Sequence, residues 1–274
     1  MPEGLVVAAI VATLGAAGVL GAVLWQISPP GRRGVVAALV LVELPLCFLA
    51  LHFVRPVWEG WVQGAVGPAW FKWARSLSAP LTEELAKAWP LVIVWRLGYL
   101  RDTPPVALGM ALGLGFGLGE VWTVAHLLSP SASVAVAHWY ELGGFIQERV
   151  CVCMAHGAFT SMLVVGAARG RPGAGLAAAM GAHFVGNFPI YLALRFLSQR
   201  VGVIALQVWT IAFFAAMAAL LVRLHTGAWA FGAALFGAVD CPRCHERYPR
   251  PFLALNFGAV RYERCAHCRT WNWT

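Results

Sequence analysis

The residues with the clearest potential for chemistry are polar side chains that interrupt long apolar stretches of the chain. Carboxylates can accept a proton from water, imidazoles can polarise it, and an amide can donate hydrogen bonds to an oxyanion, so these types together suit acyl chemistry. The candidates are Glu83, Glu84, Glu120, His156, His183 and Asn187, with Lys87 and Phe116 in supporting positions. Because an unpaired polar group in hydrocarbon costs several kcal/mol, each of them needs a partner.

Glu83 and Glu84 lie near the start of an apolar stretch, and Lys87 follows them on the same stretch. Side chains three or four residues apart are neighbours on a helix surface, so both carboxylates can approach the lysine, although about 100° separates them around the axis. Such a group could act as a general acid and base. The same residues also suit a first helical turn that Thr82 caps, where the helix dipole favours acidic side chains, and this segment by itself leaves both interpretations open.

Glycines repeat at four-residue spacing before Glu120. One row holds Gly109, Gly113 and Gly117, and a second holds Gly115 and Gly119. Small residues at this spacing let neighbouring helices approach closely in a membrane. We therefore expect Glu120 to lie inside a helix bundle rather than to face lipid.

Two histidines lie in the apolar stretches that follow. His183 and Asn187 are spaced to share one face of a helix, and His156 lies in the preceding stretch. A single histidine of this kind is more often a packed, hydrogen-bonded residue, but polar groups in four separate apolar stretches favour a shared site. We expect one polar cavity to gather these three residues with the glutamates of the two earlier stretches.

A second chemical motif lies in the C-terminal tail. Cys241-Pro-Arg-Cys244 and Cys265-Ala-His-Cys268 repeat a Cys-x2-Cys pair after 20 residues, the spacing with which two turns supply four thiolates to a tetrahedral zinc. Two disulfides are the alternative, but a tail on the cytoplasmic side would stay reduced. A segment this short cannot bury a large core, so the metal must supply much of its folding energy. We predict a structural Zn²⁺ in a zinc-ribbon domain over residues 238–274.

Lipid is the main solvent of the rest of the chain. Hydrophobic residues make up 60% and charged residues 12% of the sequence, far from the usual balance of soluble proteins. A helix needs roughly 20 mainly apolar residues to cross a bilayer, and seven stretches approach or reach that length: 4–26, 35–54, 82–99, 105–128, 149–168, 174–194 and 202–223. Residues 55–80 mix tryptophans with basic residues and suit a helix in the membrane interface. The expected fold class is therefore all-α, a polytopic transmembrane helix bundle over residues 1–230 followed by the small ribbon.

Basic residues in the connections give an orientation. Alternate connections carry arginine pairs, which are Arg32 and Arg33, Arg96 and Arg101, and Arg169 and Arg171. Because positive connections face the cytoplasm, we expect a multi-pass protein of the cell membrane with its N-terminus outside and its C-terminus inside. The net charge is +8. We attribute it to basic residues that face an anionic leaflet rather than to nucleic-acid binding, because these residues lie near the ends of the predicted spans.

The polar motifs, taken in order, resemble those of the PrsW family of intramembrane proteases, which is similar to the CAAX prenyl endopeptidases and to the Aph-type subunit of gamma-secretase. The ordered set is Glu83-Glu84-x-x-Lys87, Phe116-x-x-x-Glu120, His156-x-x-Phe-Thr160 and His183-x-x-x-Asn187, within a core of about residues 79–195. The resemblance implies a helical core in which Glu83 or Glu84 activates a water, the two histidines assist, and Asn187 stabilises the tetrahedral intermediate. Two features depart from the family pattern: Val121 follows Glu120 where the family commonly has Asn, and the cysteine tail is not part of the common core.

The leading hypothesis is an intramembrane endopeptidase that hydrolyses membrane-spanning proteins with a glutamate-activated water and needs no metal for catalysis. By resemblance, the substrates would be single-span membrane proteins such as anti-sigma factors. One alternative is a non-catalytic scaffold or regulatory subunit with the same fold. Another is a metal-dependent membrane hydrolase or cation path, which the lack of an H-E-x-x-H motif and the lysine beside two acids disfavour. The expected partners are the bilayer, a membrane-spanning substrate and, for the zinc ribbon, a protein partner.

Overall fold

The computed structural model describes residues 1–226, 238–250, 254–257 and 260–274. The chain divides into two compact units, Met1–Met217 and Ala218–Thr274, which we describe separately. The expected boundary between the membrane domain and the ribbon, at 230–238, lies almost wholly outside the described residues.

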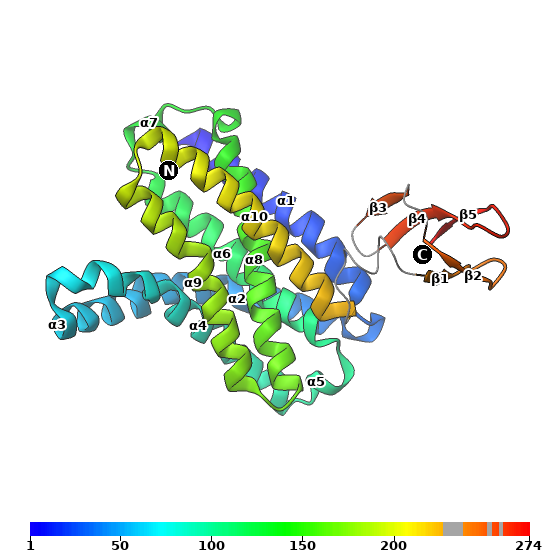
Figure 1. The fold of residues 1–274 in the computed structure, drawn as a ribbon. Helices are drawn as coiled ribbons and strands as arrows, with labels where there is room; N and C mark the ends of the chain where they lie inside the picture. Colours follow the sequence, from blue (N-terminus) through cyan, green and yellow to red (C-terminus); the bar gives the residue numbers. More distant parts are fainter. Residues whose placement is uncertain (227–237, 251–253, 258–259) are drawn as a thin grey trace. The chain divides into compact units, whose positions relative to one another are not determined.

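Helices make up the first unit (Figure 1). In chain order they are α1 (Glu3–Ile27), α2 (Arg33–Leu49), α3 (Arg55–Ala74), α4 (Ser78–Arg96), α5 (Tyr99–Asp102), α6 (Pro105–Leu128), α7 (Ala132–Ala135), α8 (Gly143–Ala168), α9 (Pro172–Phe196) and α10 (Gln199–Thr226), the last of which continues beyond Met217. Proline stands at the first turn of both α6 and α9, where its missing N–H and fixed φ favour a helix start. The breaks between the long helices thus have local causes in the sequence.

Six helical stretches are long and apolar enough to cross a membrane. Seven spans were expected, and the difference arises because one helical stretch, Pro30–Arg96, runs through two of them, 35–54 and 82–99. The other five predicted spans correspond to α1, α6, α8, α9 and α10, although α8 begins at Gly143 rather than at 149. The helical architecture typical of a membrane protein is confirmed, with six apolar stretches.

α6 is the central helix of this unit and packs against α8, α2 and α1. One row of its glycines faces α8, where a Cβ at Gly113 would overlap the backbone of His156. The other row faces α2, where a Cβ at Gly115 would overlap the carbonyl oxygen of Val40. The expectation that these rows let other helices approach closely is confirmed, and the contact with α8 holds Glu120 near His156.

Gly113→Ala is expected to lower the free energy of unfolding by about 1–3 kcal/mol, because the added methyl group would push α6 away from α8 beside His156. Gly18→Ala in α1 is the matched control, since nothing lies within 4 Å of a Cβ at that position. Replacing a helical glycine by alanine where no clash results raises the free energy of unfolding by roughly 0.5–1 kcal/mol. Unfolding in detergent micelles, followed by circular dichroism, compares the two variants, and equal stabilities would contradict the close packing of α6 on α8.

α3 is interrupted at Gly67, whose φ of 73° lies in the left-handed region that favours glycine. The chain reverses there, and the two halves of α3 form a hairpin that projects from the bundle (Figure 1). Arg75, just after the second half, pairs with Glu59 of the first half at 3.3 Å. Trp61 and Trp70 are exposed on this hairpin, which suits the membrane interface expected for it.

The second unit contains two small antiparallel sheets. β1 (Ala238–Asp240) pairs with β2 (Arg247–Pro249), and β4 (Val260–Arg264) pairs with both β3 (Leu255–Phe257) and β5 (Trp271–Trp273). One Cys-x2-Cys turn connects β1 to β2 and the other connects β4 to β5. Each turn ends on a residue with positive φ, His245 at 60° and Arg269 at 59°. The expectation of an all-α chain therefore holds for the first unit, and the tail adds short strands around its cysteines.

Candidate active site

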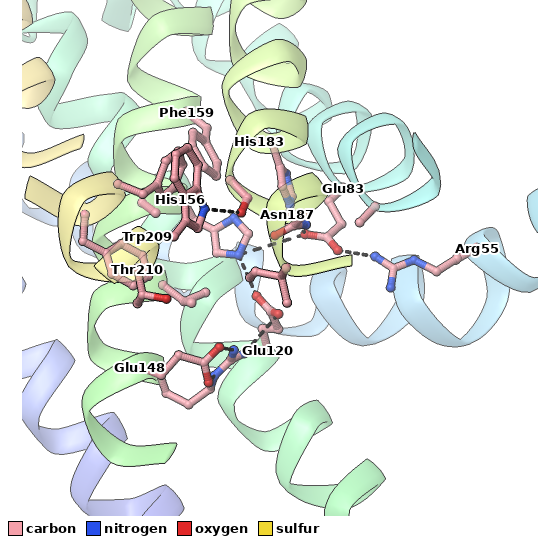
Figure 2. Close-up of a pocket in the computed structure, with 18 residues that line it drawn as sticks. Arg55, Glu83, Glu120, Glu148, His156, Phe159, His183, Asn187, Trp209 and Thr210 are labelled. Carbon is pink, nitrogen blue, oxygen red and sulfur yellow. Dashed lines mark hydrogen bonds and ion pairs between the residues drawn. The ribbon is translucent and has the colours of Figure 1, made fainter. Parts of the chain in front are cut away.

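A cavity of about 190 Å³ lies between the helices of the first unit, and most of the expected site residues line it (Figure 2). Glu83 reaches the cavity from α4, Glu120 from α6, His156 from α8, and His183 and Asn187 from α9. Five of the six predicted catalytic residues, from four helices, therefore meet at one place. The sixth, Glu84, is fully buried behind the lining.

Glu84 and Lys87 form a fully buried ion pair one turn apart on α4. Each also holds an imidazole, since His183 Nδ1 lies 2.7 Å from Glu84 Oε1 and Lys87 Nζ lies 2.9 Å from His156 Nδ1. A carboxylate only accepts hydrogen bonds, so Nδ1 of His183 carries a proton and its Nε2 presents a lone pair toward the cavity. The lysine also lies 4.9 Å from the centre of the Phe116 ring, a favourable cation–π contact. The ion pair thus sets the orientation of both histidines.

His156 is bonded at both ring nitrogens. Because Lys87 donates to Nδ1, the ring proton lies on Nε2, which donates to Glu120 Oε2 at 2.6 Å. Glu120 in turn accepts a hydrogen bond from Arg149 Nη1 at 3.1 Å, and Arg149 Nη2 donates to Glu148 at 2.6 Å. This chain of bonds fixes the tautomer of His156 and provides a partner for each charge that it contains.

Glu83 is the carboxylate that faces the cavity. Arg55, at the start of α3, forms an ion pair with Oε1, whereas Oε2 is buried and bonds to none of the described residues. This oxygen lies 3.8 Å from His183 Nε2 and 4.0 Å from His156 Nε2 (Figure 2). Because hydrogen bonds to water are about 2.8 Å long, one water can bridge two acceptors at the shorter separation. Glu83 Oε2 and His183 Nε2 therefore define a position for a single water.

The remaining wall of the cavity combines an amide with aromatic rings. Asn187 lies one helical turn after His183 and faces the cavity, where its side-chain NH₂ can donate to a bound group. Trp209 and Phe213 of α10 form an apolar side, and Trp209 Nε1 donates to the carbonyl of Gly186 at 3.1 Å, which holds α10 against α9. The site thus has a polar part for chemistry and an apolar part suited to a hydrophobic side chain.

Two basic residues complete the site without having been predicted from the sequence. Arg149 is not among the candidate residues that the sequence indicates, yet it is buried and binds Glu120. It precedes His156 by two helical turns, so helical periodicity could have indicated it. Arg55 offers no such signal, because it reaches Glu83 from another helix.

The position of Lys87 corrects one expectation. The spacing allowed it to approach both Glu83 and Glu84, but within the described residues its ion pair is with Glu84 alone. Glu83 points to a different side of α4, as the rotation of about 100° between neighbouring residues requires. The two adjacent glutamates therefore have different environments, one open to the cavity and one enclosed.

A metal ion is sterically possible beside this water position. Ligand atoms of Glu83, His156 and His183 lie within 4.8 Å of one another. Glu83 and His183 present free lone pairs, but Nε2 of His156 donates its proton to Glu120 and cannot bind a metal until that bond is broken. Glu83 and His183 therefore provide two ligands in this arrangement, whereas catalytic zinc sites usually have three protein ligands.

Glu43 of α2 is another fully buried carboxylate, and neither of its oxygens bonds to a described residue. It packs against Gly115 of α6 and is not among the residues that line the cavity. Glu43 is therefore not part of the candidate active site.

The cysteines of the second unit form a separate candidate metal site. Sγ atoms of Cys241 and Cys268 are 3.7 Å apart, and those of Cys244 and Cys265 are 3.8 Å apart. Zinc–sulfur bonds of about 2.3 Å in a tetrahedron place sulfur atoms about 3.8 Å from one another, so this donor set fits Zn²⁺. The Thr270 hydroxyl, 2.8 Å from Cys268 Sγ, lowers the pKa of that thiol to about 6, which favours the thiolate form that binds metal.

The purified full chain is expected to contain one zinc, and Cys265→Ser is expected to remove it and unfold the strands around the cysteines. Structural zinc contributes apparent binding free energies of about 10–16 kcal/mol, far more than strands of three to five residues can supply. Elemental analysis measures the metal, and limited proteolysis measures the fold. Cys151→Ser, in α8, is the matched control and should keep the zinc; metal retained in Cys265→Ser would refute the site.

Comparison of the chain with protein-family models, with curated proteins and with solved structures finds no match. The function must therefore be inferred from the cavity and its contacts.

Proposed function

We propose that this protein is an intramembrane endopeptidase in which Glu83 activates the attacking water. The observation that carries the proposal is the position of Glu83 Oε2, which is buried, unbonded within the described residues and 3.8 Å from His183 Nε2. Two acceptors at this spacing can hold a water by its two protons and leave its lone pairs free for attack. Glu84 is unsuited to this role because it does not line the cavity, and its Oε1 already bonds to Lys87 and His183. Glu83 is therefore the base.

The reaction balances on groups of the chain alone. The water oxygen attacks the peptide carbonyl carbon while Glu83 takes its proton, and the oxyanion that forms accepts a hydrogen bond from Asn187. Glu83 then gives the proton to the nitrogen as the C–N bond breaks, which restores the carboxylate and releases an acid and an amine. Loss of a single oxyanion donor typically lowers kcat by about 10²–10³, and we expect an effect of this size for Asn187→Ala.

Paired charges hold these groups in place. Arg55 anchors one oxygen of Glu83 and leaves the other toward the cavity, while Glu84 fixes the tautomer of His183. Burying a charge in a membrane bundle is tolerable only when an opposite charge or a donor accompanies it. The cost of these pairs is a reason to assign them a function rather than a packing role.

The surroundings indicate the substrate class. The cavity lies among apolar helices and has an aromatic wall that includes Trp209 and Phe213, so we propose single-span membrane proteins as substrates. The resemblance of the ordered polar motifs to the PrsW family supports this choice. In the proposed topology the N-terminus is outside the cell membrane and the ribbon is cytoplasmic, as the arginines of alternate connections indicate.

A metal-dependent hydrolase is the second candidate, favoured by the proximity of ligand atoms of Glu83, His156 and His183. It requires His156 to release Glu120. Chelation separates the two candidates, because glutamate catalysis should survive it even as the ribbon loses its zinc. Cleavage that is lost on chelation and restored by Zn²⁺, also in Cys265→Ser, would establish the metal mechanism instead.

A proteoliposome assay in H₂¹⁸O tests the proposed function. The purified chain is reconstituted with single-span substrates, and mass spectrometry locates the cut and detects one ¹⁸O atom in the new carboxyl group, as hydrolysis requires. Failure of the folded wild-type protein to cleave any such substrate would favour the scaffold alternative.

A further inference from the structure

One face of the three-stranded sheet in the second unit presents aromatic side chains to solvent. The strand register pairs Tyr262 with Trp273 and Arg264 with Trp271, and directly paired residues share a face of the sheet, as do residues two apart along a strand. The Tyr262 ring lies 5.3 Å from that of Trp271 and 4.8 Å from that of Trp273, measured between centroids. The two tryptophans are 53% and 57% exposed. We call these four residues the aromatic face.

The other face of β4 carries charged side chains that are buried. Arg261 is 2% exposed and Glu263 is fully buried, and their side chains form an ion pair at 3.3 Å. The buried Tyr248 hydroxyl donates to Glu263. An antiparallel sheet usually buries its apolar face and exposes its charged one, and here the arrangement is reversed. Burial of these exposed indole rings against a second surface would be favourable.

We propose that the aromatic face binds the headgroup region of an anionic lipid bilayer. Tyrosine and tryptophan combine an apolar ring with a polar edge, and both concentrate at membrane–water interfaces. Arg264 and Arg269 are exposed beside the rings, with Arg264 Nε donating to the carbonyl of Arg269. None of the four residues of the aromatic face is acidic. The combination of interfacial rings with arginines is complementary to anionic lipid.

The connection between α10 and β1 keeps a bilayer that α10 spans within reach of the sheets. Residues 227–237, between α10 and β1, contain no charged side chain and include Trp229, Phe231 and Phe236. A chain of this length spans at most roughly 40 Å when fully extended. With α10 in the membrane, the lipid surface is therefore the partner at the highest effective concentration around the ribbon.

The test measures the solvent access of Trp271 and Trp273 in the full chain. The protein is reconstituted in nanodiscs of phosphatidylcholine alone or of phosphatidylcholine with phosphatidylglycerol, and hydroxyl-radical oxidation of each tryptophan is measured by mass spectrometry. We expect slower oxidation in the anionic discs and its recovery at high salt, since salt screens the attraction of the arginines. Unchanged zinc content and continued protection of Tyr248 verify that the ribbon stays folded.

Arg264→Gln should weaken the lipid-dependent protection by about fivefold, the effect of one basic residue at an anionic surface. Arg247→Gln, an exposed arginine on the other sheet, is the matched control and should change the protection much less. Equal oxidation in the two kinds of disc would overturn the proposal. Protection that appears only with an added single-stranded oligonucleotide would also overturn it and assign the face to nucleic acid. The experiment does not involve peptide cleavage, so its outcome is independent of the proposed function.

Discussion

Replacing Glu83 by glutamine is expected to lower the rate of peptide hydrolysis by about 10²–10⁴ while the protein stays folded in the membrane. The amide keeps the size of the side chain and an oxygen that Arg55 can still bond, but it cannot take a proton from water. Because the change affects the reacting water rather than substrate binding, the loss should appear in kcat with little change in KM. Initial rates of product formation in proteoliposomes, measured over a range of substrate densities, provide both constants.

Glu43→Gln is the matched control, because it makes the same chemical change at a buried glutamate that is not among the cavity residues. Its rate should stay close to that of the wild type. A folded Glu83→Gln protein with full activity would refute the proposed base. If Glu84→Gln were inactive at the same time, the roles of the two adjacent glutamates would have to be exchanged.

Lys87→Met is expected to lower the free energy of unfolding by about 3–5 kcal/mol. The substitution leaves Glu84 charged and fully buried, with only His183 bonded to it among the described residues. An uncompensated buried charge is the main cost of breaking such a pair, and His156 also loses the donor to its Nδ1. Denaturant titration in mixed micelles, followed by circular dichroism, measures the change.

The double variant Glu84→Gln/Lys87→Met should regain a large part of this loss, because it leaves no unpaired charge. Asp102→Asn serves as the control at an exposed pair, where Asp102 and Arg32 lie 2.6 Å apart with side chains 60% and 31% exposed. Breaking that pair should cost about 1 kcal/mol or less. A Lys87→Met variant no less stable than Asp102→Asn would contradict the buried pair.

Spacing within one helix explains which parts of the site were predictable. His183 and Asn187 share a helical face by their separation alone, and the glycine rows before Glu120 indicate a helix that others approach closely. The structure places all three of these polar residues at the cavity. The zinc site was predictable in the same way. Each Cys-x2-Cys pair lies in one turn of the chain, and the structure brings the four sulfur atoms of the two turns together.

Contacts between helices account for what could not be predicted. Arg55 and Glu83 are 28 positions apart, so no local periodicity links them. The difference between Glu83 and Glu84 depends on the rotation of α4 about its own axis within the bundle, which the hydropathy pattern does not report. The six apolar stretches and the seven expected spans differ only at Pro30–Arg96, a stretch that includes both 35–54 and 82–99 although its backbone is non-helical at Gly67.

The burial of α6 has a consequence for biogenesis. This helix is almost entirely enclosed by its neighbours, and its glycines together with Glu120 make it less hydrophobic than α1 or α10. Such a segment partitions weakly from the translocon into lipid when alone. α1 and α2, which pack against it, are synthesised first, and we expect them to receive α6 as it leaves the translocon. The order of helices along the chain is then also an order of assembly, in which the segment bearing Glu120 enters the bilayer against partners already inserted.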